Sequence, residues 1–339
     1  MDQDISPLIK EKAPLILSEI KKASSILLHC HPSPDPDSVG SALAMKFALE
    51  QLGKKATVIK GDSEIPQAFM HFPGATEIVQ KNFLEIDLNE FDLFLSLDTA
   101  SVDRISTLGP LVFPPGLTVI NIDHHASNPG FGKIDLLETS YPATAQILFD
   151  LFSCWGIKIT HEIAANLFIG IYADTGGFKH RGTNVRTFEV AAGLAPIIPD
   201  FPNIILQMER SRTPEFIAFL GLALSSIEIF LDGKMALSIV SNAALKEKGI
   251  PSDTASSSAI SPFLTSVVDW NVGGALCEVE PGKVKASFRS TNADVYDVSK
   301  LTAALGGGGH KAAAGVTLKM SLEDAKKLVV AKAKELYNL

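Results

Sequence analysis

The chain has 339 residues, 46% hydrophobic and 20% charged, which is long enough for two packed domains and too apolar for a disordered protein. The formal net charge of −8 argues against a protein that coats long nucleic acid, although a small anionic substrate remains compatible with it. No apolar run predicts a membrane span, the first residues lack a secretory pattern, and the three scattered cysteines indicate a reducing compartment. We therefore expect a cytoplasmic protein with no membrane partner.

Short β-rich segments alternate with longer helical segments in the first half of the chain. Strands are expected at 25–30, 55–60, 91–97 and 117–122, and helices at 38–52, at 142–173 in two pieces and at 185–195. This alternation is typical of βαβ units. We expect residues 1–195 to form an α/β domain in which a mostly parallel sheet is flanked by helices.

The second half of the chain has a different pattern. Residues 196–214 contain several prolines and a mixed charged stretch, and we interpret them as a linker between domains. Residues 215–339 predict a smaller α+β domain for substrate binding, with the active-site cleft between the two domains. Its expected elements are a helix at 215–230, a strand at 234–240, a hairpin of 274–280 and 283–290, and a helix from 321 onward.

The segment HPSPDPD, residues 31–37, directly follows the first expected strand. Its three prolines stiffen the loop and argue against a helix that begins before Asp37. The loop presents His31, Asp35 and Asp37 at the carboxyl end of a strand, where open α/β sheets bind ligands. One imidazole and two carboxylates there indicate half of a site for hard divalent cations. Taken alone, the two aspartates are equally well explained as turn caps.

Further acidic residues and histidines follow other predicted elements. Asp98 comes directly after the third expected strand, and the triplet Asp123-His124-His125 comes directly after the fourth. Asp174 ends an apolar helix. Because the carboxyl ends of parallel strands share one edge of the sheet, we expect these side chains to lie side by side. Mixed nitrogen and oxygen ligands suit Mn²⁺ or Mg²⁺, and four carboxylates would balance the charge of two divalent ions.

In this order the segments resemble the motifs of the DHH phosphoesterase superfamily. The matching segments are HPSPDPDSVGS, the strand-end Asp98, the DHH triplet at 123–125, and Asp174 in ADTGGF. The later run GGGGH at 306–310, followed by AAAG, resembles the glycine-rich signature of the DHH-associated substrate domain. The resemblance spans about residues 25–316. The short chain is most similar to the small oligoribonucleases, or nano-RNases, some of which also dephosphorylate 3′-phosphoadenosine 5′-phosphate.

The resemblance implies two bound divalent ions, with Mn²⁺ preferred over Mg²⁺ or Co²⁺, and with Asp98 and Asp174 shared between them. The implied ligands are His31, Asp35, Asp37, Asp98, His124 and Asp174. Two ions a few ångströms apart suit in-line phosphoryl displacement. We expect Asp123 to orient the neighbouring histidines, and His125 to contact the scissile phosphate or protonate the leaving oxygen. The alternative for His125 is a structural histidine.

Residues of the second domain are expected to bind the far end of the substrate. Arg289 and Ser290 end a hairpin strand and can hold a phosphate by charge-assisted hydrogen bonds. The glycine run, including Gly308 and Gly309, lets backbone N–H groups approach an anion, and His310 adds a donor; the run also fits a helix stop. Such a clamp would measure substrate length. We therefore expect short single-stranded oligoribonucleotides or nucleotides as partners, and a homodimer on the resemblance alone.

The function expected first is an Mn²⁺-dependent exoribonuclease that hydrolyses very short oligonucleotides, including linear dinucleotides, to 5′-mononucleotides. Phosphatase activity on 3′-phosphoadenosine 5′-phosphate is a second expectation. A cyclic dinucleotide phosphodiesterase and an inorganic pyrophosphatase are alternatives, and the GGGGH segment argues against the latter. A non-catalytic nucleotide-sensing protein is an alternative of another class, which the six competent ligand positions argue against.

Overall fold

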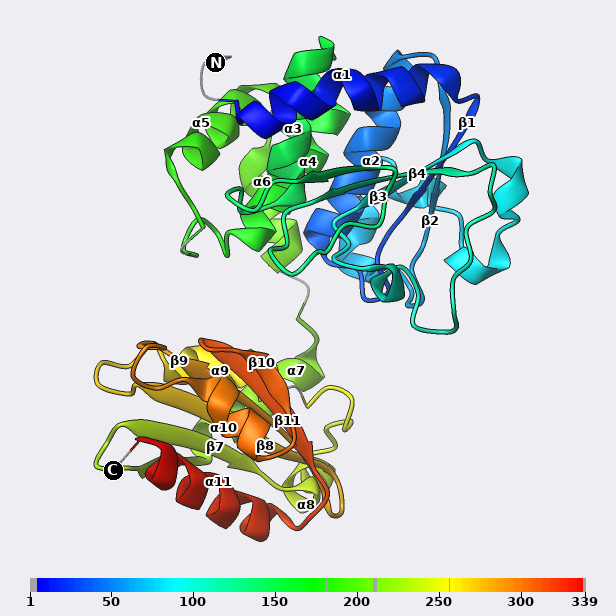
Figure 1. Cartoon of the computed structure of the whole chain (residues 1–339). Helices are drawn as coiled ribbons and strands as arrows, with labels where there is room; N and C mark the ends of the chain where they lie inside the picture. The colour runs from blue at the N-terminus through cyan, green and yellow to red at the C-terminus, as the bar shows by residue number, and fades with distance from the viewer. Residues whose placement is uncertain (1–4, 181, 210–211, 256, 338–339) are drawn as a thin grey trace. The chain divides into compact units, whose positions relative to one another are not determined.

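The computed structural model describes residues 5–180, 182–209, 212–255 and 257–337 (Figure 1). The chain divides into two units, residues 1–211 and 212–339. Each unit has its own sheet and its own hydrophobic clusters.

The sheet of the first unit has five strands in the order β2-β1-β3-β4-β5, and all its neighbours are parallel. Its strands are β1 (Ser25–His29), β2 (Lys55–Ile59), β3 (Leu93–Leu97), β4 (Thr118–Asp123) and β5 (Ile134–Leu137). The expected parallel α/β sheet is confirmed. The edge strand β5 was not expected, because its four residues follow a loop rich in glycine and lack a long apolar run.

Six α-helices are described in the first unit, and Figure 1 shows most of them gathered on one side of the sheet. They are α1 (Pro7–Lys22), α2 (Pro36–Gln51), α3 (Thr144–Trp155), α4 (His161–Asp174), α5 (Val185–Leu194) and α6 (Phe201–Glu209). The large core lies among these helices and the sheet. The other face is covered by loops and 3-10 turns, where the rings of Phe83 and Phe94 pack 4.9 Å apart.

The helix α2 begins at Pro36, one residue before the start that the prolines of the loop predicted. Proline is favoured at the first helical position because its missing N–H has no partner there anyway. Asp35 is the N-cap, and its carboxylate accepts a hydrogen bond from the Ser38 N–H at 2.9 Å. The cap fixes Asp35, and with it the end of the 31–37 loop, against the helix.

The segment 196–214, expected to be a linker, is largely part of the first unit. Its helix α6 packs Ile204, Ile205 and Met208 against the main core. Tyr172 also donates a hydrogen bond to Glu209 at 2.8 Å. The division between the units falls after residue 211, because the apolar face of α6 packs on the core of the first unit. The prolines of this segment suggested a loop, so the sequence did not predict the helix.

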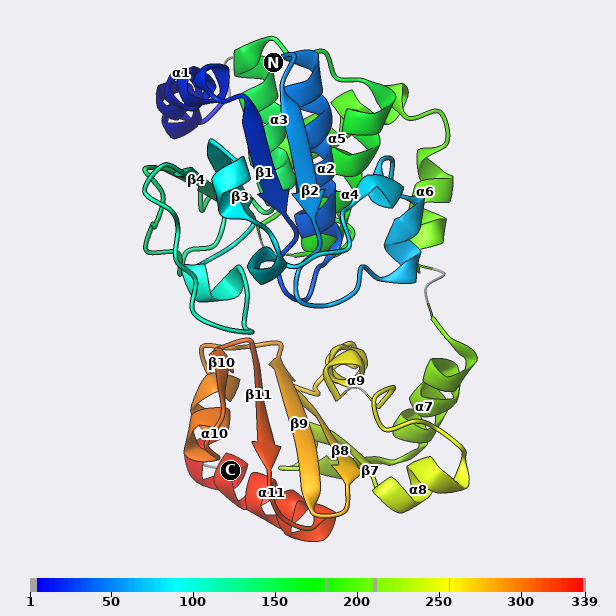
Figure 2. The same ribbon diagram turned by 90° about the vertical axis from the view of Figure 1, so that its right-hand side faces the viewer.

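The sheet of the second unit is mixed, with the order β10-β11-β9-β8-β7-β6. Its strands are β6 (Ile227–Phe230), β7 (Met235–Val240), β8 (Val272–Glu280), β9 (Lys283–Ser290), β10 (Gly308–His310) and β11 (Ala313–Leu318). Its helices are α7 (Pro214–Ser225), α8 (Asn242–Glu247), α9 (Ser257–Leu264), α10 (Val298–Ala304) and α11 (Leu322–Tyr337). The predicted β8–β9 hairpin is confirmed. Figure 2 shows α10 and α11 on one side of the strands and α7 and α9 on the other.

The helix expected at 215–230 is wrong in its last residues. The helix α7 ends at Ser225, and residues 227–230 form β6, which pairs antiparallel with β7. Ile227 and Ile229 have β-branched side chains, which favour a strand once a partner strand is present. The partner strand β7 follows after a short turn, and the expected helix overlooked this hairpin.

In the described ranges, no single helix is both long and apolar enough to cross a membrane. One sharply bent pair, Val185–Ile197 with Phe201–Glu209, reaches the required length and composition only when both parts are taken together.

Candidate metal centre

The residues predicted as metal ligands lie at the ends of three neighbouring strands and one helix. His31, Asp35 and Asp37 follow β1, Asp98 follows β3, and His124 follows β4. The strands β1, β3 and β4 are adjacent in the sheet, and their carboxyl ends share one edge. The sixth residue, the last of α4, is Asp174. Parallel pairing explains how residues so far apart in the sequence come together.

The ligand atoms of these residues form three overlapping groups, and within each group they lie within 4.8 Å of one another. The groups are His31, Asp35 and Asp98; Asp37, His124 and Asp174; and Asp98, Asp123, His124 and His125. All six predicted ligands occur in at least one group. Asp98 and His124 each occur in two of them, so the groups are parts of one cluster.

Asp98 lies at the centre of the cluster. Its Oδ2 is 3.8 Å from Nε2 of His31, and its Oδ1 is 3.5 Å from Nε2 of His124. Oδ1 also accepts a hydrogen bond from the Thr144 hydroxyl at 3.2 Å. The backbone of Asp98 has a φ of 53°, which few non-glycine residues adopt, aspartate more readily than most. The strained turn directs this buried carboxylate toward both histidines.

Asp37 is fully buried and caps a helix other than its own. Its carboxylate accepts hydrogen bonds from the backbone N–H groups of Thr144, at 2.7 Å, and Ala145, at 3.0 Å, in the first turn of α3. Burial, together with the charge of Asp174, raises the pKa of Asp37 to about 8. Asp37 therefore caps a helix and belongs to the cluster at the same time.

His124 and Asp174 form the third side of the cluster, with Nε2 and Oδ2 at 3.2 Å. Nε2 of His124 is buried and has no partner in hydrogen-bond geometry among the described residues. Burial lowers the pKa of this imidazole, but Asp174 and Asp37 outweigh it and raise the pKa to about 9. A buried polar atom without a partner costs about 1–3 kcal/mol, which a bound cation would remove.

The cluster also concentrates negative charge away from water. Burial, together with the charges of Asp37 and Asp35, raises the pKa of Asp98 well above its ordinary value. A divalent cation offsets such repulsion, and carboxylate oxygens with imidazole nitrogens form a suitable donor set. The residues present therefore fit a bound divalent cation.

Asp123 is fully buried and holds the residues that follow it. Its Oδ1 is 2.8 Å from Nδ1 of His125 and accepts a hydrogen bond from the backbone N–H of His124 at 2.9 Å. Its Oδ2 accepts a hydrogen bond from the Asn128 amide at 2.7 Å. Burial raises the pKa of Asp123, but the bonds from His125 and Asn128 outweigh it and lower the pKa overall. The ionised carboxylate thus fixes the His125 ring through Nδ1, leaving Nε2 available.

The structure shows four hydrogen bonds at the cluster, made by Thr144 and Asn128, that the sequence did not predict. Thr144 contributes its hydroxyl to Asp98 and its backbone N–H to Asp37. The amide of Asn128 donates to Asp123 and to the carbonyl oxygen of Thr99, at 3.0 Å, and so ties the β3 and β4 loops together. Except for the local bond between Asn128 and Asp123, these contacts join residues far apart in the chain, and no spacing pattern identifies them.

The residues predicted to bind substrate in the second unit lie at one end of its sheet. His310 pairs with Ala313, and Ala313 pairs with Arg289 on β9. Ser290 ends β9, and its hydroxyl accepts a hydrogen bond from the backbone N–H of Asn292 at 3.2 Å. The register thus brings Arg289 and His310 into one row across the sheet.

The glycine run of the second unit has two structural roles. Gly306 follows α10 with a φ of 83°, so the predicted helix stop is correct. Gly308 and Gly309 continue into the short strand β10. At Gly309, φ is 138° and an added Cβ would lie 2.5 Å from the Cα of Ala314. Glycine is therefore required there by the close approach of β11.

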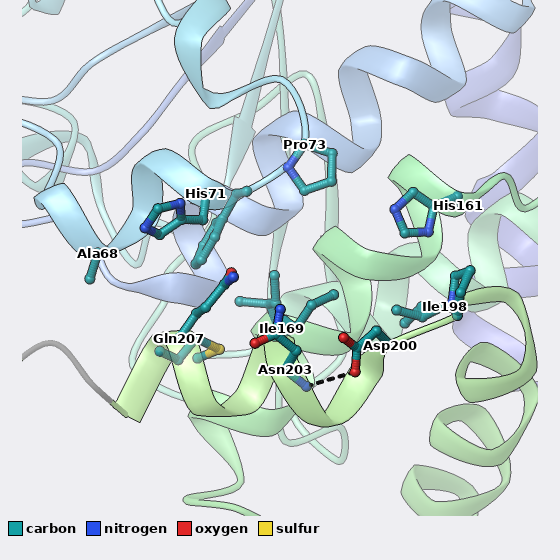
Figure 3. A pocket seen from close by; sticks show the side chains of 13 residues that line it. Ala68, His71, Pro73, His161, Ile169, Ile198, Asp200, Asn203 and Gln207 are labelled. Atoms are coloured by element: carbon teal, nitrogen blue, oxygen red, sulfur yellow. Dashed lines mark hydrogen bonds between the residues drawn. The ribbon is translucent and has the colours of Figure 1, made fainter.

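A separate cavity of about 360 Å³ lies in the first unit between α4, α6 and the 3-10 turn Gln67–His71 (Figure 3). His71 and His161 lie near opposite ends of it, and Asp200 accepts a hydrogen bond from the backbone N–H of Asn203 at its edge. None of its described lining residues belongs to the carboxylate and histidine cluster.

Comparison with known families gives the same two-part division. Residues 25–171 match the DHH family, N-terminal domain, and residues 264–338 match the DHHA1 domain. The chain therefore contains a DHH domain and, after it, a DHHA1 domain. The resemblance drawn from the motifs is confirmed. The DHH match contains five of the six predicted ligands and ends shortly before Asp174.

Relatives of this DHH–DHHA1 chain match it over nearly its whole length. A protein of Thermus thermophilus named bifunctional oligoribonuclease and PAP phosphatase NrnA is 29% identical over 325 residues, which cover 94% of this chain and 93% of the relative. A protein of the same name from Bacillus subtilis is 24% identical and covers 89% of this chain and 92% of its own length.

Solved structures support the same fold. An exopolyphosphatase-related protein from Bacteroides fragilis superposes with a TM-score of 0.87 at 22% identity, covering 99% of this chain and 98% of the other. RecJ of Thermus thermophilus, solved with Mn²⁺, gives a TM-score of 0.51 at 17% identity and covers 98% of this chain and 56% of RecJ. At these identities the similarity concerns the DHH–DHHA1 fold alone.

Proposed function

We propose that this DHH–DHHA1 chain is a two-metal phosphoesterase that hydrolyses very short oligoribonucleotides, including linear dinucleotides, to 5′-mononucleotides. The observation that carries the proposal is the overlap of the ligand groups at Asp98 and His124, because overlapping groups allow two ions to share ligands. The names of the full-length relatives favour this substrate class and a second activity on 3′-phosphoadenosine 5′-phosphate.

We assign the six predicted ligands to two ions, with Mn²⁺ as the preferred metal. In this assignment His31 and Asp35 would hold one ion, Asp37, His124 and Asp174 would hold the other, and Asp98 would contribute to both. Bound divalent ions supply positive charge for the attacking and leaving oxygens of an in-line phosphoryl displacement. Two histidines and four carboxylates give the mixed donor set on which the preference for manganese rests.

His125 is the group that we assign to proton transfer. Asp123 accepts the Nδ1–H of this imidazole, so Nε2 carries the lone pair or the proton that reaches a substrate oxygen. The side chain of His125 is 44% exposed, in contrast to the 15% of His124, and is therefore accessible to a phosphate. Asp123 acts through His125 and is a positioning residue.

The second unit supplies substrate binding in this proposal. Arg289, Ser290 and His310, with the backbone N–H groups of Gly308 and Gly309, bind the phosphate at the far end of the substrate. A clamp on one end of a chain favours short substrates. The proposal also includes a cytoplasmic location and a homodimer, and native mass spectrometry tests the dimer.

Product analysis tests the proposed activity. The full chain is incubated with Mn²⁺ and, in parallel, with labelled diadenylate, 3′-phosphoadenosine 5′-phosphate, a cyclic dinucleotide, pyrophosphate and a twenty-nucleotide RNA. We expect 5′-AMP from diadenylate, little product from the long RNA, and no product when EDTA replaces the metal. Release of phosphate from pyrophosphate alone, or equal rates on long and short RNA, would contradict the proposal.

A further inference from the structure

One face of the second unit's sheet is only partly covered. Along β9, Val284, Ala286 and Phe288 are buried in the core formed with α10 and α11, and the residues between them face the opposite side. On that side α7 packs on β7, and α9 packs on β8 and β9. Beyond α9, no described helix of the second unit packs closely on this face of β11 and β10.

The strand register arranges the open face into three rows. Residues paired directly across antiparallel strands point to the same face. The rows are His310, Ala313 and Arg289; Gly308, Gly315 and Ser287; and Thr317 and Lys285. A cationic side chain thus stands at each end, with small residues between. At about 3.3 Å per residue, the Cα atoms of Arg289 and Lys285 are about 13 Å apart.

A cavity of about 510 Å³ lies over the row that contains Ser287 and the row that contains Lys285, between β11 and the beginning of α9. Its lining includes Ser257, Lys285, Ser287, Gly315 and Thr317. The hydroxyl groups of Ser257 and Ser287 are 2.9 Å apart and share a hydrogen bond. At Gly315 an added Cβ would lie 3.2 Å from the carbonyl oxygen of Ala286. Glycine therefore leaves room at the bottom of the cavity that a side chain would fill. The cavity is polar and offers several hydroxyl groups beside one ammonium group.

The two cations of this face lack acidic partners. Neither Lys285 nor Arg289 forms an ion pair with any residue that the structure describes. Burial lowers the pKa of Arg289, with no nearby carboxylate to raise it. Asp253 also lines the cavity but makes no ion pair with Lys285. The negative charge of Asp253 would repel a bound anion. Removing this charge should therefore strengthen binding, whereas removing the charge of Lys285 should weaken it.

We propose that the cavity beside Lys285 binds a second phosphate of an oligonucleotide whose end is held by Arg289 and His310. The identity of the ligand as RNA rests on the proposed function. The Lys285 ammonium, the Thr317 hydroxyl and whichever of the Ser257 and Ser287 hydroxyl groups accepts the hydrogen bond between them donate hydrogen bonds to the phosphate oxygens. A nucleotide that bears all its phosphates on one ribose occupies the Arg289 end only. The cavity therefore favours oligonucleotides over mononucleotides.

Binding measured without hydrolysis tests the inference. The full chain in EDTA is titrated into 3′-labelled pentaadenylate, and unlabelled 3′-phosphoadenosine 5′-phosphate competes in a second titration. We expect Lys285→Ala to weaken pentaadenylate binding about tenfold, to lower the slope of log Kd against log salt by about one, and to leave the mononucleotide within about twofold. Asp253→Asn should tighten pentaadenylate binding.

The matched control is Lys327→Ala, which removes the same charge from α11 on the covered side of the sheet, where the side chain is 70% exposed. This control should change neither Kd. Equal weakening of both ligands by Lys285→Ala, or no weakening, would overturn the inference. Hydrolysis by the same proteins with Mn²⁺ is scored separately. A Lys285-dependent Kd without hydrolysis would reject the proposed function alone, and hydrolysis without that dependence would reject the inference alone.

Discussion

At the scale of the residue, the cluster depends on buried carboxylates that each perform two tasks. Asp37 caps α3 while facing the cluster, and Asp123 orients His125 while holding Asn128. The sequence predicted which side chains come together in this cluster because each follows a strand or ends a helix. It could not predict the partners that fix them, since Thr144 and Asn128 are ordinary polar residues until the fold brings them close.

His125 is expected to matter for turnover rather than for metal binding. Replacing it with alanine removes the proposed proton donor, so kcat on diadenylate should fall by about 10²- to 10⁴-fold. The affinity for Mn²⁺, measured by calorimetry, should change little because His125 is outside the assigned ligands. Near-normal kcat would instead support the structural-histidine interpretation.

Asn128 is expected to act through Asp123. Asn128→Ala removes the amide that bonds both Asp123 and the Thr99 carbonyl, so metal affinity or kcat should fall by about 10- to 100-fold. Asn89→Ala is the control, because that amide bonds only the carboxylate of Asp87 on an exposed turn. Equal effects of both changes on activity would contradict the positioning role.

At the scale of the element, the sequence predicted the strands of the first sheet well because they are short apolar runs between clear loops. It failed where tertiary contacts decide the structure. Residues 227–230 continue an apolar pattern but pair with β7 as a strand, and 201–209 form a helix whose apolar face needs the main core. The strand β10, formed by Gly308, Gly309 and His310, exists only through its pairing with β11.

Gly309 and Gly308 offer a matched test of this β10–β11 approach. Gly309→Ala introduces a Cβ beside Ala314 at a φ of 138°, so the second unit should lose about 1–3 kcal/mol of unfolding free energy. Gly308→Ala meets no atom within 4 Å and should lose at most about 1 kcal/mol. Urea denaturation measures both. Equal losses would contradict the assigned geometry.

At the scale of the whole molecule, the cluster links metal binding to pH and stability. Asp37 has a raised pKa of about 8, so its contribution to stability is lost as the pH rises from its unfolded value near 3.8 through 8. His124 has a raised pKa of about 9, so its contribution is present below its unfolded value near 6.5 and is lost as the pH rises through 9. Both effects destabilise the metal-free protein between pH 6.5 and 8.

Thermal unfolding with and without Mn²⁺ checks this linkage. In EDTA the Tm should fall from pH 6 to pH 8, and the increase in Tm produced by Mn²⁺ should be larger at pH 8, because metal replaces protons on the same side chains. Asp37→Asn should flatten the dependence in EDTA. A Tm in EDTA that rises over this interval would contradict the assigned protonation.

The order of motifs along the chain predicted both domains, and the family comparison agrees with it. The boundary between the units was beyond the sequence, because Pro196, Pro199 and Pro202 suggested a loop where α6 packs on the first core. The sequence likewise could not predict that His310 and Arg289 lie in one row, because the register of strands depends on hydrogen bonds between separate segments.

The central claim is that six side chains hold two ions for phosphodiester hydrolysis, with Asp98 shared between them. The most direct test is the rate at which labelled diadenylate becomes 5′-AMP with saturating Mn²⁺, compared between the unaltered chain and Asp98→Asn. Asp103→Asn, an exposed aspartate on the turn after β3, is the control. We expect Asp98→Asn to lose at least about a thousandfold in kcat while the control keeps its rate. Hydrolysis by Asp98→Asn at the unaltered rate would contradict the claim.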